Sequence, residues 1–200
     1  MTIVLATSNK GKLREFKEMC QVDIVSFQDL LGEFEVDETE DSFQGNSILK
    51  SETIYNMLPN KEEYIVVADD SGLVVPSLNG EPGIYSARYS GIDASDKDNM
   101  DKLITNLDAK NIQNCEAHYT CAISIVSKYG TYCVHGWIYG EISTTPKGDK
   151  GFGYDPLFTP IGYNQTMAQI DKSLKSKISH RANALKLAKP IIEMCNSLNS

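Results

Sequence analysis

The chain has 200 residues, of which 41% are hydrophobic and 23% charged, and its formal net charge at pH 7 is −8. This composition is typical of a single soluble globular domain, and the acidic excess argues against a nucleic-acid-binding surface. The five cysteines have no zinc-binding spacing, no apolar run could span a membrane, and the short apolar amino terminus predicts a strand rather than a signal peptide. We therefore expect one cytoplasmic domain, residues 1–200, with reduced thiols, that binds neither nucleic acid nor membrane.

The first third of the chain predicts alternating strands and helices. Residues 3–6 form a continuous apolar run, typical of a buried strand, and a helix is expected to start near Asn9 or Lys10. A second strand is expected over 22–27 and a helix over 42–58. Residues 64–68 give the strongest strand signal in the chain.

The rest of the chain predicts further strands, a hairpin and two helices. We expect a strand over 73–78, a short helix over 98–107, a hairpin of 117–127 and 131–139, a glycine-rich loop over 146–155, and a last helix that Ser179 caps and Pro190 bends or interrupts. Because strands and helices are mixed along the chain, the predicted class is α/β with a mixed β-sheet and flanking helices.

The turn after the first strand contains Thr7, Ser8, Asn9 and Lys12. Hydroxyls and free backbone amides at a helix start, with a lysine one turn further on, suit a phosphate group. Many helices begin in the same way with nothing bound, and the spacing alone favours such an ordinary helix cap.

Asp69 and Asp70 follow the most apolar strand of the chain. Adjacent carboxylates at the end of a buried strand repel each other unless a cation or a raised pKa relieves them. A Mg²⁺ site needs few protein carboxylates, because the ion keeps waters and binds substrate phosphates. An acidic turn facing water is the alternative, and it is the more usual explanation for the acidic run over 35–41.

Glycines alternate with aromatic residues in the segment 151–156. Such a loop can expose its rings as a platform on which a nucleobase stacks. The same composition is equally typical of a turn whose aromatic rings fill the core, and composition does not separate the two.

Five blocks of sequence occur together in one order. They are Thr7-Ser8-Asn9 with Lys12; Glu38-Thr39 with Ser42-Phe43, Asn46 and Lys50; Asp69 to Leu73, continuing to Gly80, Pro82-Gly83 and Ser86 to Tyr89; Gly151 to Pro156; and Ser179-His180-Arg181. In this order and at these separations they closely resemble the inosine triphosphatase family, also called Ham1-like or noncanonical purine nucleoside triphosphate pyrophosphatases. The resemblance covers nearly the whole chain.

The resemblance implies a phosphate and metal site in the first half of the chain. The residues expected to bind the triphosphate are Thr7, Ser8, Asn9, Lys10, Gly11, Lys12 and Lys50. Glu38 and Asp70 would hold Mg²⁺, the expected cofactor, with Asp69 close by. Asp70 would also be the catalytic proton acceptor.

The resemblance implies that the nucleoside is recognised mainly by the second half. Ser71 would contact the substrate, and the nucleoside pocket would be bounded by Phe152, Gly153, Tyr154 and Asp155. Lys175, His180 and Arg181 would recognise the base. The implied fold is an elongated mixed sheet in two lobes with the active site in the cleft between them, and the implied assembly is a homodimer.

Two positions depart from the family's pattern. Glu40 stands where the family usually has glycine, and Ser47 where it usually has alanine. Neither has an assigned role, but Glu40 puts the turn around Glu38 in doubt and adds an acid near the metal.

The expected reaction is hydrolysis of ITP, dITP or XTP to the monophosphate and pyrophosphate, which removes deaminated purines from the nucleotide pool. A water activated by Asp70 would attack the α-phosphorus. The alternatives are a Maf-like pyrophosphatase acting on other modified nucleotides and a nucleotide-binding module without activity. Blocks 151–155 and 179–181 count against the first, and the presence of Glu38, Lys50 and Asp70 counts against the second.

Overall fold

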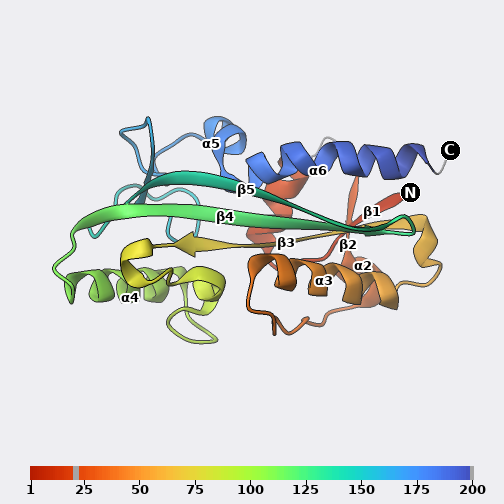
Figure 1. Cartoon of the computed structure of the whole chain (residues 1–200), viewed down its shortest axis with the longest axis horizontal. Coiled ribbons are helices and arrows are strands. Elements are labelled where there is room, and N and C mark those ends of the chain that lie inside the picture. Colours follow the sequence, from red (N-terminus) through yellow and green to blue (C-terminus); the bar gives the residue numbers. More distant parts are fainter. Residues whose placement is uncertain (20–22, 199–200) are drawn as a thin grey trace. The chain divides into compact units, whose positions relative to one another are not determined.

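A computed structural model describes residues 1–19 and 23–198. Six strands form one sheet in the order β2-β1-β3-β4-β5-β6 (Figure 1). They are β1 (Thr2–Leu5), β2 (Ile24–Ser26), β3 (Tyr64–Val74), β4 (Asn114–Ser127), β5 (Gly130–Ser143) and β6 (Phe158–Pro160). The helices are α1 (Lys10–Met19), α2 (Phe27–Leu31), α3 (Phe43–Met57), α4 (Asp96–Asp108), α5 (Lys172–Ile178) and α6 (His180–Ser197). The predicted α/β class with a mixed sheet is confirmed.

The sheet contains both parallel and antiparallel pairs. Strand β1 runs parallel to β2 and to β3, with Val4 beside Val25 on one side and Val66 on the other. Strands β5 and β6 are antiparallel, with Glu141 beside Thr159. Only two residues connect β4 to β5, the tight turn of the expected hairpin.

The chain folds into two compact units, and strands β3, β4 and β5 contribute residues to both. Unit 1 consists of residues 1–70, 121–136 and 181–200, and unit 2 of residues 71–120 and 137–180. The predicted cleft between two lobes and the single domain stay predictions.

Unit 1 has a core on each face of its strands. On one face Ile65 and Val67 of β3 pack with residues of α1 and α6. On the other face Val66 and Ala68 pack with residues of α2 and α3. This alternation follows from the period of two in a β-strand, and it decides where the next two residues of β3 point.

Unit 2 has its own core. It is built from buried side chains of β3, β4, β5 and α4 together with the segment that precedes α5, among them Leu73, Leu103, Tyr119, Tyr154 and Phe158. Helix α4 begins at a capping box, in which the Ser95 hydroxyl accepts from the Asp98 amide and the Asp98 carboxylate accepts from the Ser95 amide.

One predicted strand was wrong, the predicted interruption of the last helix is excluded, and two short elements were not expected. Residues 73–78 are not a separate strand, because β3 continues through Asp70 to Val74 and a 3₁₀ turn follows over Pro76–Leu78. Helix α6 is not interrupted at Pro190, since Ala184, Ala188 and Cys195 are buried on both sides of the proline and hold the helix to the core. The short elements β6 and α5 were not expected.

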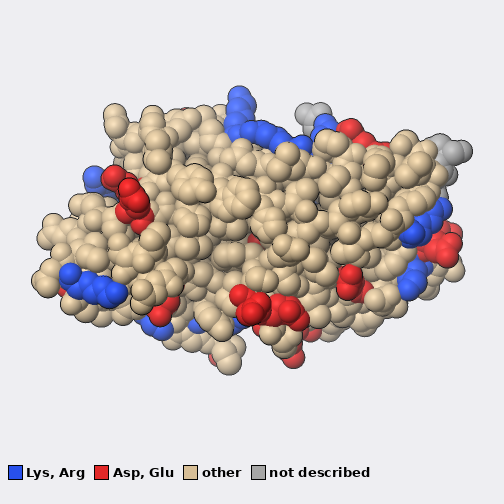
Figure 2. Space-filling model, viewed as in Figure 1, with Lys and Arg blue, Asp and Glu red and all other residues tan. Residues whose placement is uncertain are grey.

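None of the described helices is long and apolar enough to cross a membrane. The four described cysteines are free thiols, and Cys20 lies outside the described residues. On the face shown in Figure 2, the described lysine and arginine side chains lie in separate places rather than in one basic patch.

Candidate active site

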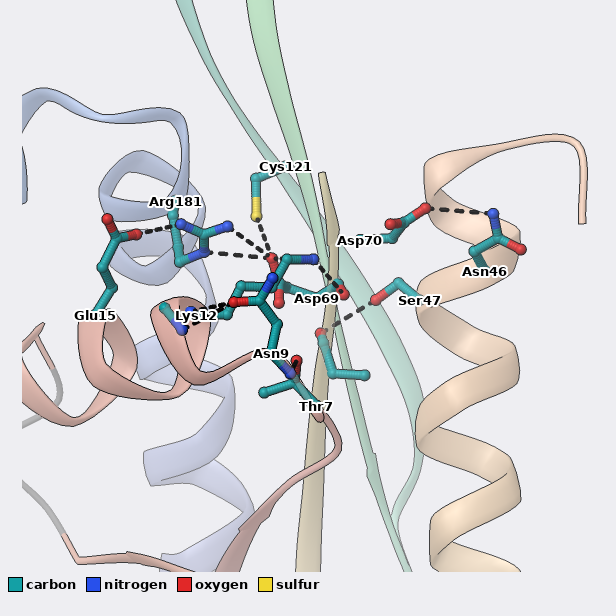
Figure 3. A network of polar contacts seen from close by, with 12 residues as sticks. Thr7, Asn9, Lys12, Glu15, Asn46, Ser47, Asp69, Asp70, Cys121 and Arg181 are labelled. Carbon is teal, nitrogen blue, oxygen red and sulfur yellow. Dashed lines mark hydrogen bonds and ion pairs between the residues drawn. The ribbon is translucent and has the colours of Figure 1, made fainter. Parts of the chain in front are cut away.

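Strand β3 points the two adjacent aspartates to opposite faces of unit 1. Asp69 continues the row of Ile65 and Val67 and lies toward α1 and α6, whereas Asp70 lies toward α3 (Figure 3). Both side chains are buried, with Asp69 fully enclosed and Asp70 4% exposed. The alternative of an acidic turn facing water is therefore excluded for Asp69 and Asp70, and the two carboxylates have different surroundings.

Asp69 is held by two cations from distant parts of the chain. Its Oδ2 lies 3.3 Å from Nζ of Lys12, and it accepts from Nη2 of Arg181 at 3.1 Å and from Nε at 3.3 Å. The Nη1 of Arg181 donates to Glu15 of α1. Burial acts to raise the pKa of Asp69, but Lys12, Arg181 and Lys50 outweigh it and hold that pKa well below its usual range.

We expect Asp69→Asn to destabilise unit 1 by about 3–5 kcal/mol at pH 7, because it leaves Lys12 and Arg181 buried without their shared anion. An acid whose folded-state pKa is lowered stabilises the fold above its unfolded pKa, about 3.9, and loses that stabilisation as the pH falls through the folded value. Urea unfolding of wild type and variant should therefore differ most near neutral pH, and the difference should shrink progressively as the pH falls below about 4. Asp93→Asn, at an exposed loop position, is the control. A difference that stayed constant with pH would contradict this assignment of charge.

Asp70 faces two polar residues of α3. Its Oδ2 accepts from Nδ2 of Asn46 at 3.3 Å, and its Oδ1 lies 3.6 Å from Nζ of Lys50. Asn46 and Lys50 are four residues apart, so both lie on the helix face that meets β3. Lys50 also donates to Oε1 of Glu38 at 2.7 Å.

The pKa values on this face are coupled. Burial raises the pKa of Asp70, while Lys50 and Lys12 act in the opposite direction and do not cancel the rise. Burial acts to lower the pKa of Lys50, but Asp70, Glu38 and Asp69 outweigh it and raise that pKa. Lys50 is thus a permanent cation between two carboxylates, and Asp70 is a stronger base than an ordinary aspartate.

Glu38 and Asp70 were expected to hold Mg²⁺, and both carboxylates contact the same lysine ammonium. Their oxygen atoms are the ligand type that Mg²⁺ prefers. No group of three or more His, Cys, Asp or Glu side chains in a metal-binding arrangement occurs among the described residues. Two carboxylates are nevertheless enough for Mg²⁺, which completes its shell with waters and substrate phosphates, so the donor set fits this ion.

The loop before α1 forms a helix cap. Oδ1 of Asn9 accepts from the amides of Gly11 and Lys12 at 2.9 and 3.1 Å, and Oγ1 of Thr7 accepts from the Asn9 amide at 3.2 Å. Thr7 is buried, Ser8 and Asn9 are exposed, and Lys10 is the first residue of α1. The capping interpretation is confirmed, and the phosphate-binding role of this loop stays a prediction.

In unit 2 the loop 151–155 is built around Asp155. Its Oδ2 accepts from Nζ of Lys175 at 2.6 Å and from the Phe152 amide at 3.0 Å. Gly151 has φ +83°, and a Cβ at this position would lie 2.0 Å from Oδ2 of Asp155, so only glycine fits. The Gly153 amide donates to Asp96, the first residue of α4.

The aromatic residues of this loop divide between the two predicted uses. Tyr154 is buried in the core of unit 2 and donates from its hydroxyl to the carbonyl of Ser86. Phe152 is only partly buried, and Nζ of Lys175 lies 4.9 Å from its ring centroid. Phe152 therefore keeps part of its ring accessible, and its stacking on a nucleobase stays a prediction.

The last motif, Ser179-His180-Arg181, divides between the two units. His180 belongs to unit 2, where its ring stacks on Tyr119 with centroids 4.8 Å apart. Arg181 belongs to unit 1, and the hydrogen bonds from its guanidinium go to Asp69 and Glu15. Ser71, the first residue of unit 2, is partly buried.

Two residues of these networks were missed by the sequence analysis. Glu15 lies three residues after Lys12, hence on the same helix face, and this spacing could have indicated it. Asp96 is far in sequence from the loop that it contacts, and no signal in the chain points to that contact.

The Ham1 family model matches residues 3–191. The chain belongs to the Ham1 family. A dITP/XTP pyrophosphatase of Sulfurovum sp. strain NBC37-1 is 55% identical, and the match covers 97% of this chain and 94% of that protein. The Ham1 protein of Staphylococcus aureus superposes with a TM-score of 0.83 at 40% identity, covering 96% of this chain and 98% of the other. A Ham1 protein of Coxiella burnetii gives a TM-score of 0.85 at 30% identity, covering 97% of this chain and 99% of the other.

Proposed function

We propose that this Ham1-family chain hydrolyses the noncanonical purine nucleoside triphosphates ITP, dITP and XTP to the monophosphate and pyrophosphate with Mg²⁺. The observation that carries the proposal is the buried Asp70, which lies against Asn46 and shares Lys50 with Glu38. The name of the Sulfurovum relative, dITP/XTP pyrophosphatase, supports the substrate class. Family membership does not favour the Maf-like alternative.

The proposal gives the phosphate and metal chemistry to unit 1. The residues that bind the triphosphate are Thr7, Ser8, Asn9, Lys10, Gly11, Lys12 and Lys50. Glu38 and Asp70 hold Mg²⁺, which when bound supplies positive charge to the phosphate oxygens. Lys12 and Lys50 stabilise the negative charge that develops on the leaving pyrophosphate.

Asp70 accepts the proton of the attacking water. Its surroundings support this role, because burial raises its pKa and therefore its basicity, while Lys50 keeps the ionised form accessible. The amide of Asn46 donates to Oδ2 and so fixes the orientation of the carboxylate.

Recognition of the nucleoside and its base is proposed for residues outside the phosphate and metal site. Ser71 contacts the substrate, and the nucleoside pocket is bounded by Phe152, Gly153, Tyr154 and Asp155. The base is recognised by Lys175, His180 and Arg181. Lys175 with Asp155 offers a donor beside an acceptor. A purine 6-keto oxygen accepts from such donors, whereas the amino group of adenine presents a donor to donors, which costs on the order of 1–3 kcal/mol for each unpaired group.

The bond that breaks can be identified with water labelled by a heavy oxygen isotope. If water attacks the α-phosphorus, the label appears in the monophosphate and the pyrophosphate carries none. Mass spectrometry of both products from ITP tests this directly. Label in pyrophosphate, or release of inorganic phosphate with a diphosphate, would refute the proposed bond choice.

A homodimeric state, a cytoplasmic location and the absence of nucleic-acid or membrane partners also stay proposals. The nucleotide itself is the only partner that the proposed chemistry requires.

A further inference from the structure

Three serine side chains form a buried hydroxyl cluster in unit 1. Ser47 and Ser51 of α3 and Ser124 of β4 are each fully enclosed. The hydroxyl oxygens of Ser47 and Ser51 lie 2.9 and 2.8 Å from that of Ser124. Three polar groups in one apolar interior are costly unless every one is hydrogen-bonded, so this cluster needs an explanation.

The cluster is internally satisfied and joins a helix to two strands. The Ser47 hydroxyl donates to the carbonyl of Ala68 at 3.1 Å and accepts from the amide of Ser124 at 3.0 Å. The Ser124 hydroxyl donates to the Ser47 carbonyl at 2.7 Å, which leaves Ser51 free to donate to Ser124. Ser47 is therefore bonded to β3 and to β4 at once (Figure 3 shows the bond to β3).

These bonds are made beside the proposed catalytic residues. Ala68 immediately precedes Asp69 and Asp70, and Ser47 immediately follows Asn46 and precedes Lys50 by three residues. A helix turns about 100° and rises about 1.5 Å per residue, so a hydrogen bond at Ser47 fixes both the rotation and the axial position of its neighbours. The Asn46–Asp70 bond is already 3.3 Å long, so a small shift of α3 would lengthen it beyond hydrogen-bond distance.

We propose that Ser47, with Ser124 and Ser51, is a positioning residue that sets α3 against β3 so that Asn46 and Lys50 meet Asp70. Its effect on turnover rests on the proposed function, whereas its effect on the placement of α3 does not.

The test compares Ser47→Ala with Ile123→Val. Ile123 lies on the opposite face of β4 from Ser124, in the apolar cluster with Leu5 and Val67. We expect Ser47→Ala to lower kcat for ITP roughly 10- to 100-fold with KM changed less than about threefold, because misplacement by about 1 Å is enough for a loss of this size. Ile123→Val should keep the wild-type kcat. Equal kcat for Ser47→Ala and wild type would overturn the inference while leaving the proposed function intact.

A second measurement does not depend on the reaction. Amide hydrogen exchange over residues 46–50 should be about tenfold faster in Ser47→Ala than in wild type, and unchanged in Ile123→Val. The double variant Ser47→Ala with Asn46→Ala should lose less kcat than the two single losses multiplied together, since both changes act on the Asn46–Asp70 contact. If wild type released no pyrophosphate from any nucleotide, the proposed function would fail and the exchange data would still decide the placement of α3. Unchanged exchange would refute it.

Discussion

Replacing Asp70 by asparagine should lower kcat for ITP by a factor of about 10²–10⁴ while the fold survives. The amide cannot accept the proton of the attacking water, and it offers Mg²⁺ one neutral oxygen in place of a carboxylate. The measurement is kcat at saturating Mg²⁺, with pyrophosphate as the detected product. Turnover near the wild-type level under these conditions would remove Asp70 from the role of proton acceptor.

The stability of the same variant gives an independent check. A carboxyl whose folded pKa is raised prefers its neutral form in the folded state, so ionised Asp70 costs stability at neutral pH. In metal-free buffer at pH 7, Asp70→Asn should therefore be at least as stable as wild type, although Asp69→Asn, one residue away, should be much less stable. Loss of stability in both variants would contradict the opposite surroundings of the two carboxylates.

Replacing Arg181 by alanine should have the second-largest effect. The sequence predicts that losing a donor to the keto oxygen weakens transition-state binding of ITP more than that of ATP. The ratio of their kcat/KM values should therefore change by about 1–3 kcal/mol. The structure adds a stability cost, because the side chain is 2% exposed and its loss removes the buried cation that Asp69 and Glu15 share. We expect about 3–5 kcal/mol of destabilisation in urea unfolding.

Two further variants distinguish recognition of the base by Arg181 from its role in neutralising Asp69. Lys175→Ala removes a proposed base contact in unit 2 whose partner is Asp155, and should change the ITP-to-ATP ratio without disturbing Asp69. Arg181→Lys keeps the charge but loses the fork of donors. Arg181→Ala could lower kcat/KM for ITP and ATP equally while Lys175→Ala changed their ratio. In that case Arg181 would support phosphate binding through Asp69 and would not recognise the base.

The sequence predicted the elements that have a strong periodic signal. Helix α3 was expected within one residue of its observed bounds and β3 at its observed start, and the pair Asp69-Asp70 was expected at the end of a buried strand. The apolar run ends before these residues, so the predicted strand ended at residue 68. In the structure β3 continues, since Lys12, Arg181 and Lys50 neutralise the carboxylates.

What the sequence could not supply is contact between residues far apart in the chain. Arg181 meets Asp69 across 112 positions and Ser124 meets Ser47 across 77, and no local pattern encodes either pair. Strand β6 has three residues and α5 carries three lysines in seven, so neither shows a periodic apolar signal. Such elements form because their apolar residues pack into the surrounding core.

The most direct test of the proposed activity is a kcat/KM panel with Mg²⁺ that compares ITP, dITP and XTP with ATP, with pyrophosphate and phosphate assayed separately. The proposed chemistry predicts the monophosphate and pyrophosphate from the three noncanonical nucleotides. It predicts a kcat/KM at least about 10²-fold below theirs for ATP, because several donors are left unpaired by its amino group. Comparable hydrolysis of ATP, or inorganic phosphate as the first product, would contradict it.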